Sequence, residues 1–198
     1  MTRLDFWCEL ASPYTYLAAM RIEPRAAAAG VELRWQPFAL GPIFAAVGWS
    51  TSPFEIYPDK GRYMWRDVAR EADALGLALR RPSQFPRNSI AAARVALLGI
   101  DRGWGPAFIR AALAANFADD RDIAAPDVID DLLTGLGLDG PALRDESMTP
   151  AQRPALRAAT ERATALHIFG APTFVVGDEL FWGNDRLERA LMWAAAAR

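Results

Sequence analysis

The first forty residues change from a strand-like to a helix-like pattern of hydrophobic and polar side chains and back again. Leu4–Cys8 is rich in β-forming residues, and Tyr14–Ala29 has the Ala, Leu, Met and Arg content of a helix. Gly30 ends this predicted helix, and Val31–Phe38 alternates as a second strand. The order strand, helix, strand predicts the opening of an α/β fold.

From Pro42 to about Leu166 the pattern is helical and requires no strand. The segment Gly48–Pro58 has the composition of a loop. The predicted helices that follow it are Arg62–Leu75, Asn88–Arg102, Pro106–Phe117, Pro126–Leu136 and Ala151–Leu166. We expect these helices to form one insertion.

Strand patterns return near the C-terminus, at Thr173–Val176 and Glu179–Trp182, and a last helix is expected over Asn184–Ala196. Asn184 and Asp185 are side chains that favour the N-cap of such a helix. The sequence therefore predicts a discontinuous α/β domain of residues 1–41 and 167–198, with an inserted helical domain of residues 42–166.

Composition and charge narrow the classes of partner. The 198 residues carry a formal net charge of −2, and no cluster of basic residues offers the field that a polyphosphate needs. The longest apolar runs, such as Ile90–Ile100, are too short to cross a bilayer, and the first residues have no signal-peptide layout. We expect a cytoplasmic protein that neither binds nucleic acid nor enters a membrane.

The chain has one cysteine, Cys8, and one histidine, His167. A single cysteine cannot form an internal disulfide, and the two residues cannot build a Cys/His zinc cage. We therefore expect neither dithiol redox chemistry nor a metal site. Cys8 is expected to be a buried, inert thiol, and His167 a residue without a catalytic role.

Ser12 and Pro13 stand where the first predicted helix begins. Serine is a favoured N-cap, and proline is favoured at the first helical position because its missing N–H is not needed there. The sequence therefore predicts that the Ser12 hydroxyl lies at a helix N-terminus.

Five short motifs follow one another along the chain. They are Asp5-Phe6, Ser12-Pro13-Tyr14-Thr15-Tyr16-Leu17-Ala18, Pro58-Asp59-Lys60-Gly61-Arg62-Tyr63-Met64, Phe169-Gly170-Ala171-Pro172-Thr173-Phe174 and Trp182-Gly183-Asn184-Asp185-Arg186-Leu187. Over essentially the whole chain, this set resembles the 2-hydroxychromene-2-carboxylate isomerases and the related kappa-class glutathione transferases, which have a DsbA-type thioredoxin fold. The resemblance implies a thioredoxin-like α/β fold with a large all-helical insertion, in which Ser12 to Thr15 replace the Cys-x-x-Cys motif.

The resemblance also implies that glutathione is the cofactor and that Ser12 is the catalytic residue. A hydroxyl can donate a hydrogen bond to a thiolate, and the helix N-terminus adds partial positive charge and free N–H groups. Both effects lower the pKa of a bound thiol from about 8.5 towards neutrality.

Five further residues are predicted by resemblance to bind the cofactor. Pro172 matches the cis-proline of the family and precedes a strand that we expect at the edge of the sheet. The backbone N–H and C=O of Ala171 are expected to be free to pair with the cysteinyl part of glutathione. Asn184 and Asp185 would meet its γ-glutamyl end, and Lys60, the only lysine in the chain, would pair with its glycyl carboxylate.

The predicted activity is a glutathione-dependent cis-trans isomerisation of an aromatic pyruvate-type compound, such as 2-hydroxychromene-2-carboxylate to trans-o-hydroxybenzylidenepyruvate. Trp49, Phe54, Tyr57 and Trp65 are candidates for an aromatic substrate pocket. The alternatives are a kappa-class-like glutathione transferase or peroxidase, and a thioredoxin-fold binding module without chemistry. By resemblance, a homodimer is expected.

Overall fold

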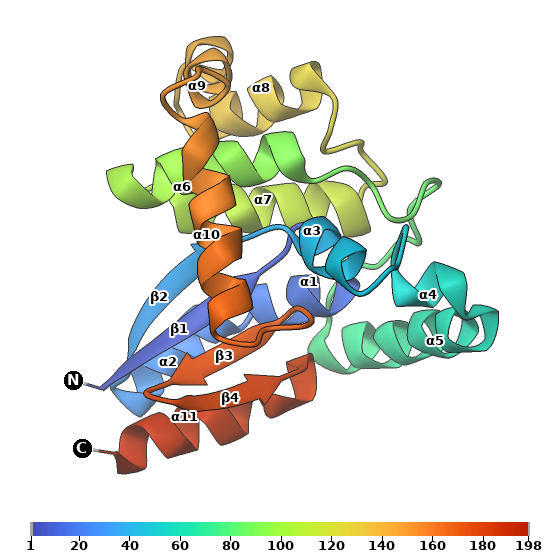
Figure 1. The fold of residues 1–198 in the computed structure, drawn as a ribbon, viewed down its shortest axis with the longest axis vertical. Coiled ribbons are helices and arrows are strands. Elements are labelled where there is room, and N and C mark those ends of the chain that lie inside the picture. The colour runs from blue at the N-terminus through green and yellow to red at the C-terminus, as the bar shows by residue number, and fades with distance from the viewer. Residues whose placement is uncertain (1, 198) are drawn as a thin grey trace.

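A four-stranded mixed sheet organises the computed structural model, which describes residues 2–197 (Figure 1). Strand β1 (Arg3–Cys8) pairs in parallel with β2 (Glu32–Pro37) and antiparallel with β3 (Thr173–Val176). Strand β4 (Glu179–Trp182) pairs antiparallel with β3, which gives the order β2-β1-β3-β4. The four predicted strands are confirmed. The expectation that β3 lies at an edge is wrong, because β4 folds back and covers its outer side.

Strand β1 alternates between two apolar layers, which is why its sequence has few polar residues. Phe6 is fully buried and stacks on Phe174 at a centroid distance of 5.4 Å, in the layer that contains α2 and α11. Trp7 points to the opposite layer and packs with Phe38 and Ala163. Helix α10 crosses this second face in Figure 1, whereas α2 lies behind the sheet.

The single helix predicted over Tyr14–Ala29 is two helices, α1 (Pro13–Ala19) and α2 (Ile22–Ala29). The break has a local cause. Proline has no N–H and its ring clashes with the carbonyl four residues earlier, so Pro24 is tolerated only in the first turn of a new helix. Helix α2 ends at Gly30, whose φ of 63° is left-handed, as predicted.

Eight helices lie between β2 and β3 within the described residues. They are α3 (Leu40–Ala46), α4 (Pro53–Ile56), α5 (Pro58–Leu75), α6 (Ile90–Arg102), α7 (Gly105–Phe117), α8 (Pro126–Gly135), α9 (Gly140–Ser147) and α10 (Arg153–Ala165). The predicted region of helices is confirmed, but α3, α4 and α9 were not predicted. Their Gly and Pro residues indicate a loop by composition, although proline fits the first turn of a helix. The division into two domains stays a prediction.

The last helix, α11 (Leu187–Ala196), begins later than predicted. A short 3-10 turn, η1 (Asn184–Arg186), precedes it, and neither Asn184 nor Asp185 makes a side-chain cap bond. The predicted N-cap role is therefore wrong. Gly183 reverses the chain with a φ of 114°, which brings the Asn184 side chain against Arg21 instead of a helix end.

Candidate functional site

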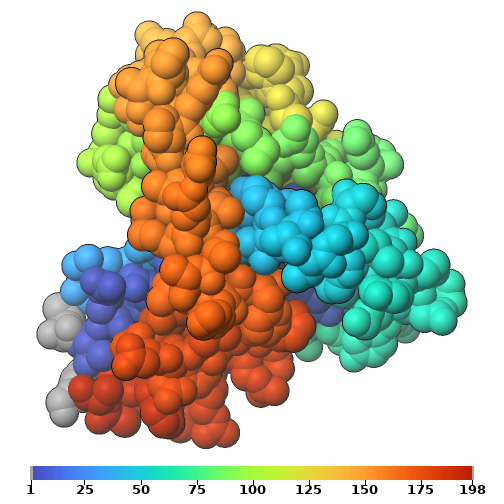
Figure 2. Space-filling model, in the orientation of Figure 1, coloured from blue at the N-terminus to red at the C-terminus, as the bar shows by residue number. Residues whose placement is uncertain are grey.

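A cavity of about 1170 Å³ opens where the N-terminus of α1 meets the loop before β3. In Figure 2 a hollow between α3 and the C-terminal strands exposes the blue atoms of the N-terminal segment. Five of the six predicted site residues line the cavity, namely Ser12, Lys60, Ala171, Asn184 and Asp185. Pro172, the sixth, is not among the lining residues, and its carbonyl accepts a hydrogen bond from the Gly183 N–H at 2.9 Å.

Ser12 is the N-cap of α1, as predicted. Its backbone is extended (φ −92°, ψ 119°), its Oγ accepts from the Thr15 N–H at 3.2 Å, and Pro13 fills the first helical position. The side chain is also drawn towards the loop before β3, because its hydroxyl donates to the Ala171 carbonyl at 2.9 Å. Ser12 therefore joins two segments that lie 159 residues apart.

Ala171 differs in part from the prediction. The Ala171-Pro172 peptide bond is cis, as expected. The Ala171 carbonyl is not free, however, because the Ser12 hydroxyl occupies it. Within the part of the chain that the structure describes, the Ala171 N–H makes no hydrogen bond. The loop thus offers a donor to a ligand, and its acceptor becomes available when the hydroxyl rotates.

Lys60 lies in the first turn of α5 and is exposed. Its Nζ is 5.2 Å from the centroid of the Tyr57 ring, and it makes no ion pair with any residue from 2 to 197. The N–H groups at a helix N-terminus already carry partial positive charge. A lysine in this turn therefore adds to a positive region that an anion would neutralise.

Asn184 and Asp185 have different environments within η1. Asn184 is buried, and both its backbone carbonyl and its Oδ1 accept from the Arg21 guanidinium, at 2.8 and 2.9 Å. The Asp185 side chain is 68% exposed and lies 3.5 Å from Arg186. Asp185 therefore has free acceptor capacity at the cavity, whereas the acceptors of Asn184 already hold Arg21.

Aromatic side chains form much of the rim. Trp49 and Phe54 line the cavity, as predicted, whereas Tyr57 and Trp65 do not. Trp65 packs against Phe85 at a centroid distance of 5.0 Å instead. Further aromatic residues that were not predicted also line the cavity, and two of them, Phe169 and Trp182, pack edge to face at 4.9 Å.

Glu9 is a further cavity residue that the sequence did not indicate. It is 6% exposed, its Oε2 accepts from the Ala11 N–H at 2.9 Å, and its Oε1 accepts from the Ser89 hydroxyl. Burial raises the pKa of Glu9 to about 7, although these two hydrogen bonds lower it. Ser89 lies 80 residues away, so no local pattern could predict this contact.

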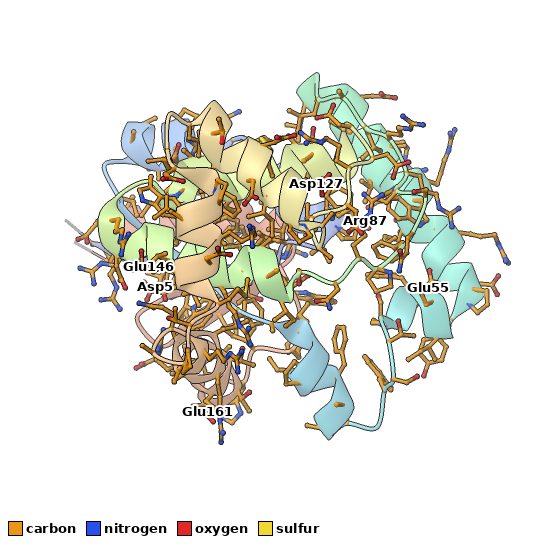
Figure 3. The ribbon with its side chains drawn as sticks, turned by 90° about the horizontal axis from the view of Figure 1, so that it is seen from above. Asp5, Glu55, Arg87, Asp127, Glu146 and Glu161 are labelled. Atoms are coloured by element: carbon orange, nitrogen blue, oxygen red, sulfur yellow. The ribbon has the colours of Figure 1, made fainter. Side chains whose placement is uncertain are left out.

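Arg87 anchors the segment that carries Ser89. Its guanidinium donates to the Asn116 Oδ1 at 3.0 Å and to the Arg121 carbonyl at 2.8 Å, and it pairs with Asp120. Figure 3 shows Arg87 in the interior, whereas Glu55 on α4 lies at the periphery. Although Arg87 lines the cavity, its charge is already neutralised by the protein.

Neither Cys8 nor His167 is among the residues that line the cavity. Cys8 is fully buried in the core, and burial, followed by the charge of Glu9, raises the pKa of its thiol. His167 is exposed, with a left-handed φ of 58° after α10, and it does not line the cavity. Within residues 2–197, no helix combines the length and the apolar character that a membrane span needs.

Comparison with known proteins agrees with this architecture. The profile of the DSBA-like thioredoxin domain matches residues 3–191. This chain belongs to the DsbA-like thioredoxin domain family. The predicted fold, a thioredoxin-like α/β core with an all-helical insertion, is therefore confirmed.

The chain is also similar to several proteins that are named 2-hydroxychromene-2-carboxylate isomerase. The one from Sphingobium xenophagum is 29% identical over 186 residues, which cover 93% of this chain and 94% of the relative. The one from Pseudomonas putida is 27% identical over 190 residues, covering 93% and 90%. A solved structure of 2-hydroxychromene-2-carboxylate isomerase superposes with a TM-score of 0.86 at 25% identity, covering 98% of this chain and 94% of that one. The predicted resemblance to these isomerases is confirmed, and the kappa-class resemblance stays a prediction.

Proposed function

We propose that this chain is a glutathione-dependent cis-trans isomerase of an aromatic pyruvate-type compound, with 2-hydroxychromene-2-carboxylate or an analogue as substrate. The observation that carries the proposal is the Ser12 hydroxyl, which lies at the N-terminus of α1 against the Ala171 carbonyl in a cavity of about 1170 Å³. The relatives that are named 2-hydroxychromene-2-carboxylate isomerase add support for an isomerase.

The chemistry of the cavity residues fits glutathione. The Ala171 N–H is an unused donor, Asp185 is an exposed carboxylate, and Lys60 is a cation that makes no ion pair among residues 2–197. These groups complement a backbone carbonyl, an α-ammonium and a carboxylate, which glutathione carries along its length. Asn184 would contribute indirectly, by fixing the turn that carries Asp185, because its own acceptors already bind Arg21.

When it is bound, the glutathione thiolate supplies reversible addition to a conjugated double bond, which makes that bond rotatable. Ser12 would stabilise the thiolate by turning its hydroxyl from the Ala171 carbonyl to the sulfur. The first turn of α1 adds partial positive charge at the same place. Trp49 and Phe54 would hold the aromatic ring of the substrate and exclude water.

An assay with the chromene as substrate tests the proposal. We expect its conversion to the trans product to require glutathione and to leave the glutathione unchanged after many turnovers. Stoichiometric consumption of glutathione with a chlorinated nitrobenzene, without chromene conversion, would instead indicate a transferase. Absence of glutathione binding at millimolar concentration would indicate a binding module without this chemistry.

We also propose a homodimer in the cytoplasm. Sedimentation of the purified chain measures the first part directly, and a mass equal to one chain at micromolar concentration would contradict it.

A further inference from the structure

Glu9 lies on the same turn as Ser12. The Ser12 N–H donates to the Glu9 carbonyl at 3.2 Å, and the Glu9 side chain folds over this turn to reach the Ala11 N–H. Glu9 lines the cavity although the residue is almost completely buried. The turn that begins with Glu9 and ends with Ser12 therefore carries a carboxyl group as well as the hydroxyl.

Among the described residues, no cation pairs with the Glu9 carboxylate. Among residues 2–197 Glu9 makes no ion pair, and its partners are one hydroxyl and one backbone N–H. The Arg87 guanidinium, two residues before Ser89, is occupied by Asp120 and by carbonyl groups. Cys8 on β1 precedes Glu9 in the chain. The other titratable groups that line the cavity are Tyr14 on α1, Asp59, Lys60, Tyr63, Asp67 and Glu71 on α5, Arg87 before α6 and Asp185 on η1. A buried carboxylate without a cation readily takes up a proton.

We propose that the Glu9 carboxylate accepts the thiol proton of bound glutathione and holds it for transfer to an oxygen of the substrate. This inference rests on the proposed function, since it concerns the same thiol. The proton moves from sulfur to a carboxylate oxygen of Glu9, so the negative charge moves to the sulfur and no other reactant is needed. Ser12 then stabilises the sulfur, and Glu9 is neutral beside it.

Proton transfer to Glu9 and stabilisation of the thiolate by Ser12 are compatible with each other. A carboxylate and a thiolate on one turn would repel each other, whereas a neutral carboxyl beside a thiolate does not. The pKa of Glu9 near 7 leaves the group ionised in the free protein at pH 8, and the charge of a nearby thiolate raises this pKa further. The carboxyl is therefore a base before glutathione binds and an acid afterwards, which general acid-base catalysis requires.

Proton release on glutathione binding tests this without any turnover. Titration calorimetry at pH 8 in buffers of different ionisation enthalpy counts the protons released, and ultraviolet absorbance counts the thiolate formed. For the unmodified protein we expect thiolate to form with almost no proton released, and a protonated-carboxyl infrared band to appear. Glu9→Gln should release close to one proton for each thiolate. Glu71→Gln, which alters an exposed glutamate of the same cavity, should behave as the unmodified protein does.

A second variant keeps the test decisive if Glu9→Gln does not fold. The Ser89 hydrogen bond lowers the pKa of Glu9, so Ser89→Ala should shift the pH range of proton-neutral binding upwards. Release of one proton per thiolate by the unmodified protein, or an unshifted range in Ser89→Ala, would overturn the role of Glu9. Absence of thiolate in the unmodified protein would instead contradict the proposed function itself.

Discussion

Lys60 places a cation where the first turn of α5 already carries partial positive charge. We expect Lys60→Ala to weaken glutathione binding by about 1–3 kcal/mol, which is roughly 5- to 150-fold in the dissociation constant. Turnover at saturating glutathione should change little, because the glycyl end is remote from the reacting atoms. Calorimetry and steady-state kinetics measure the two effects. Unchanged affinity with a large loss of saturated turnover would move Lys60 to the substrate or to the chemical step.

Asp185 is exposed, caps no helix and, among residues 2–197, pairs only with the exposed Arg186, so we expect removal of its charge to cost little stability. Asp185→Asn should weaken glutathione binding, because the amide no longer attracts the α-ammonium group. The midpoint of thermal unfolding should stay the same, since substitutions at exposed sites alter stability by only about 0.5 kcal/mol. A melt and a binding titration on the same sample check both. Equal affinity for the variant and the unmodified protein would remove Asp185 from the site.

For single residues, the sequence predicted those structural roles that depend only on near neighbours in the chain. Ser12 could be predicted as an N-cap because serine followed by proline is a signal read within a few residues. Glu9 could not, because its burial depends on Ser89, which the tertiary fold brings from 80 residues away. The engaged carbonyl of Ala171 was missed for the same reason, since its partner lies 159 residues earlier.

The Arg21 side chain, at the break between α1 and α2, links this part of the chain to the turn η1 and to α11. Its guanidinium donates twice to Asn184 and pairs with Glu188. Arg21→Met should lower the free energy of unfolding by about 1–3 kcal/mol, because the buried acceptors of Asn184 lose their partner. Glutathione affinity should fall too, since η1 carries Asp185.

The matched control is Glu188→Gln, which removes only a half-exposed ion pair. It should change stability by about 1 kcal/mol or less and leave glutathione affinity unchanged. Denaturant unfolding and calorimetry of both variants measure these effects. If both variants lost the same affinity for glutathione, the hydrogen bonds from Arg21 to Asn184 would not be what positions the turn η1.

Among the elements, strands and long helices could be predicted, and short helices could not. Strand β1 is rich in β-forming residues, and α6 and α7 have long Ala-rich patterns, so composition alone was sufficient. Helix α3 begins Leu-Gly-Pro, which indicates a loop until packing decides otherwise. The break before α2 follows from Pro24, a signal that was present in the sequence but not used.

At the scale of the whole molecule, the burial of Glu9 should affect how the free energy of unfolding depends on pH. The carboxyl ionises near 4.5 in the unfolded chain and near 7 in the folded protein. Between these values the unfolded chain loses a proton that the folded protein keeps, so the contribution of Glu9 to stability is lost as the pH rises. A rise of this size in the pKa of Glu9 corresponds to about 3 kcal/mol.

Denaturant unfolding from pH 4 to pH 8, without ligand, tests this expectation. Other titrating groups are shared by the two proteins, so the difference between the unmodified protein and Glu9→Gln isolates this one. We expect the unmodified protein to lose about 3 kcal/mol relative to the variant across this range. A constant difference would show that Glu9 ionises normally in the folded state.

The order of elements along the chain predicted a split α/β fold with a helical insertion, and the resemblance of the motifs implied that this fold is thioredoxin-like. The match to the DsbA-like family confirmed it. The cavity was not predictable in the same way. Its wall combines residues from α1, α3, α4, α5, the Arg87 segment and the loop before β3, and only the tertiary fold brings these together. Thus Trp49 and Phe54 face the cavity while Trp65, close in sequence, packs on Phe85.

The most direct test of the account is the ultraviolet absorbance of thiolate when glutathione binds at neutral pH. We predict that the unmodified protein shows this absorbance and that Ser12→Ala loses most of it, because the hydroxyl that stabilises the sulfur is gone. Ser52→Ala is the control, since Ser52 also caps a helix and lines the cavity but lies on α4. Loss of the N-cap costs about 0.5–2 kcal/mol, so a melt must first show that both variants are folded. An undiminished thiolate signal in folded Ser12→Ala would contradict the central claim.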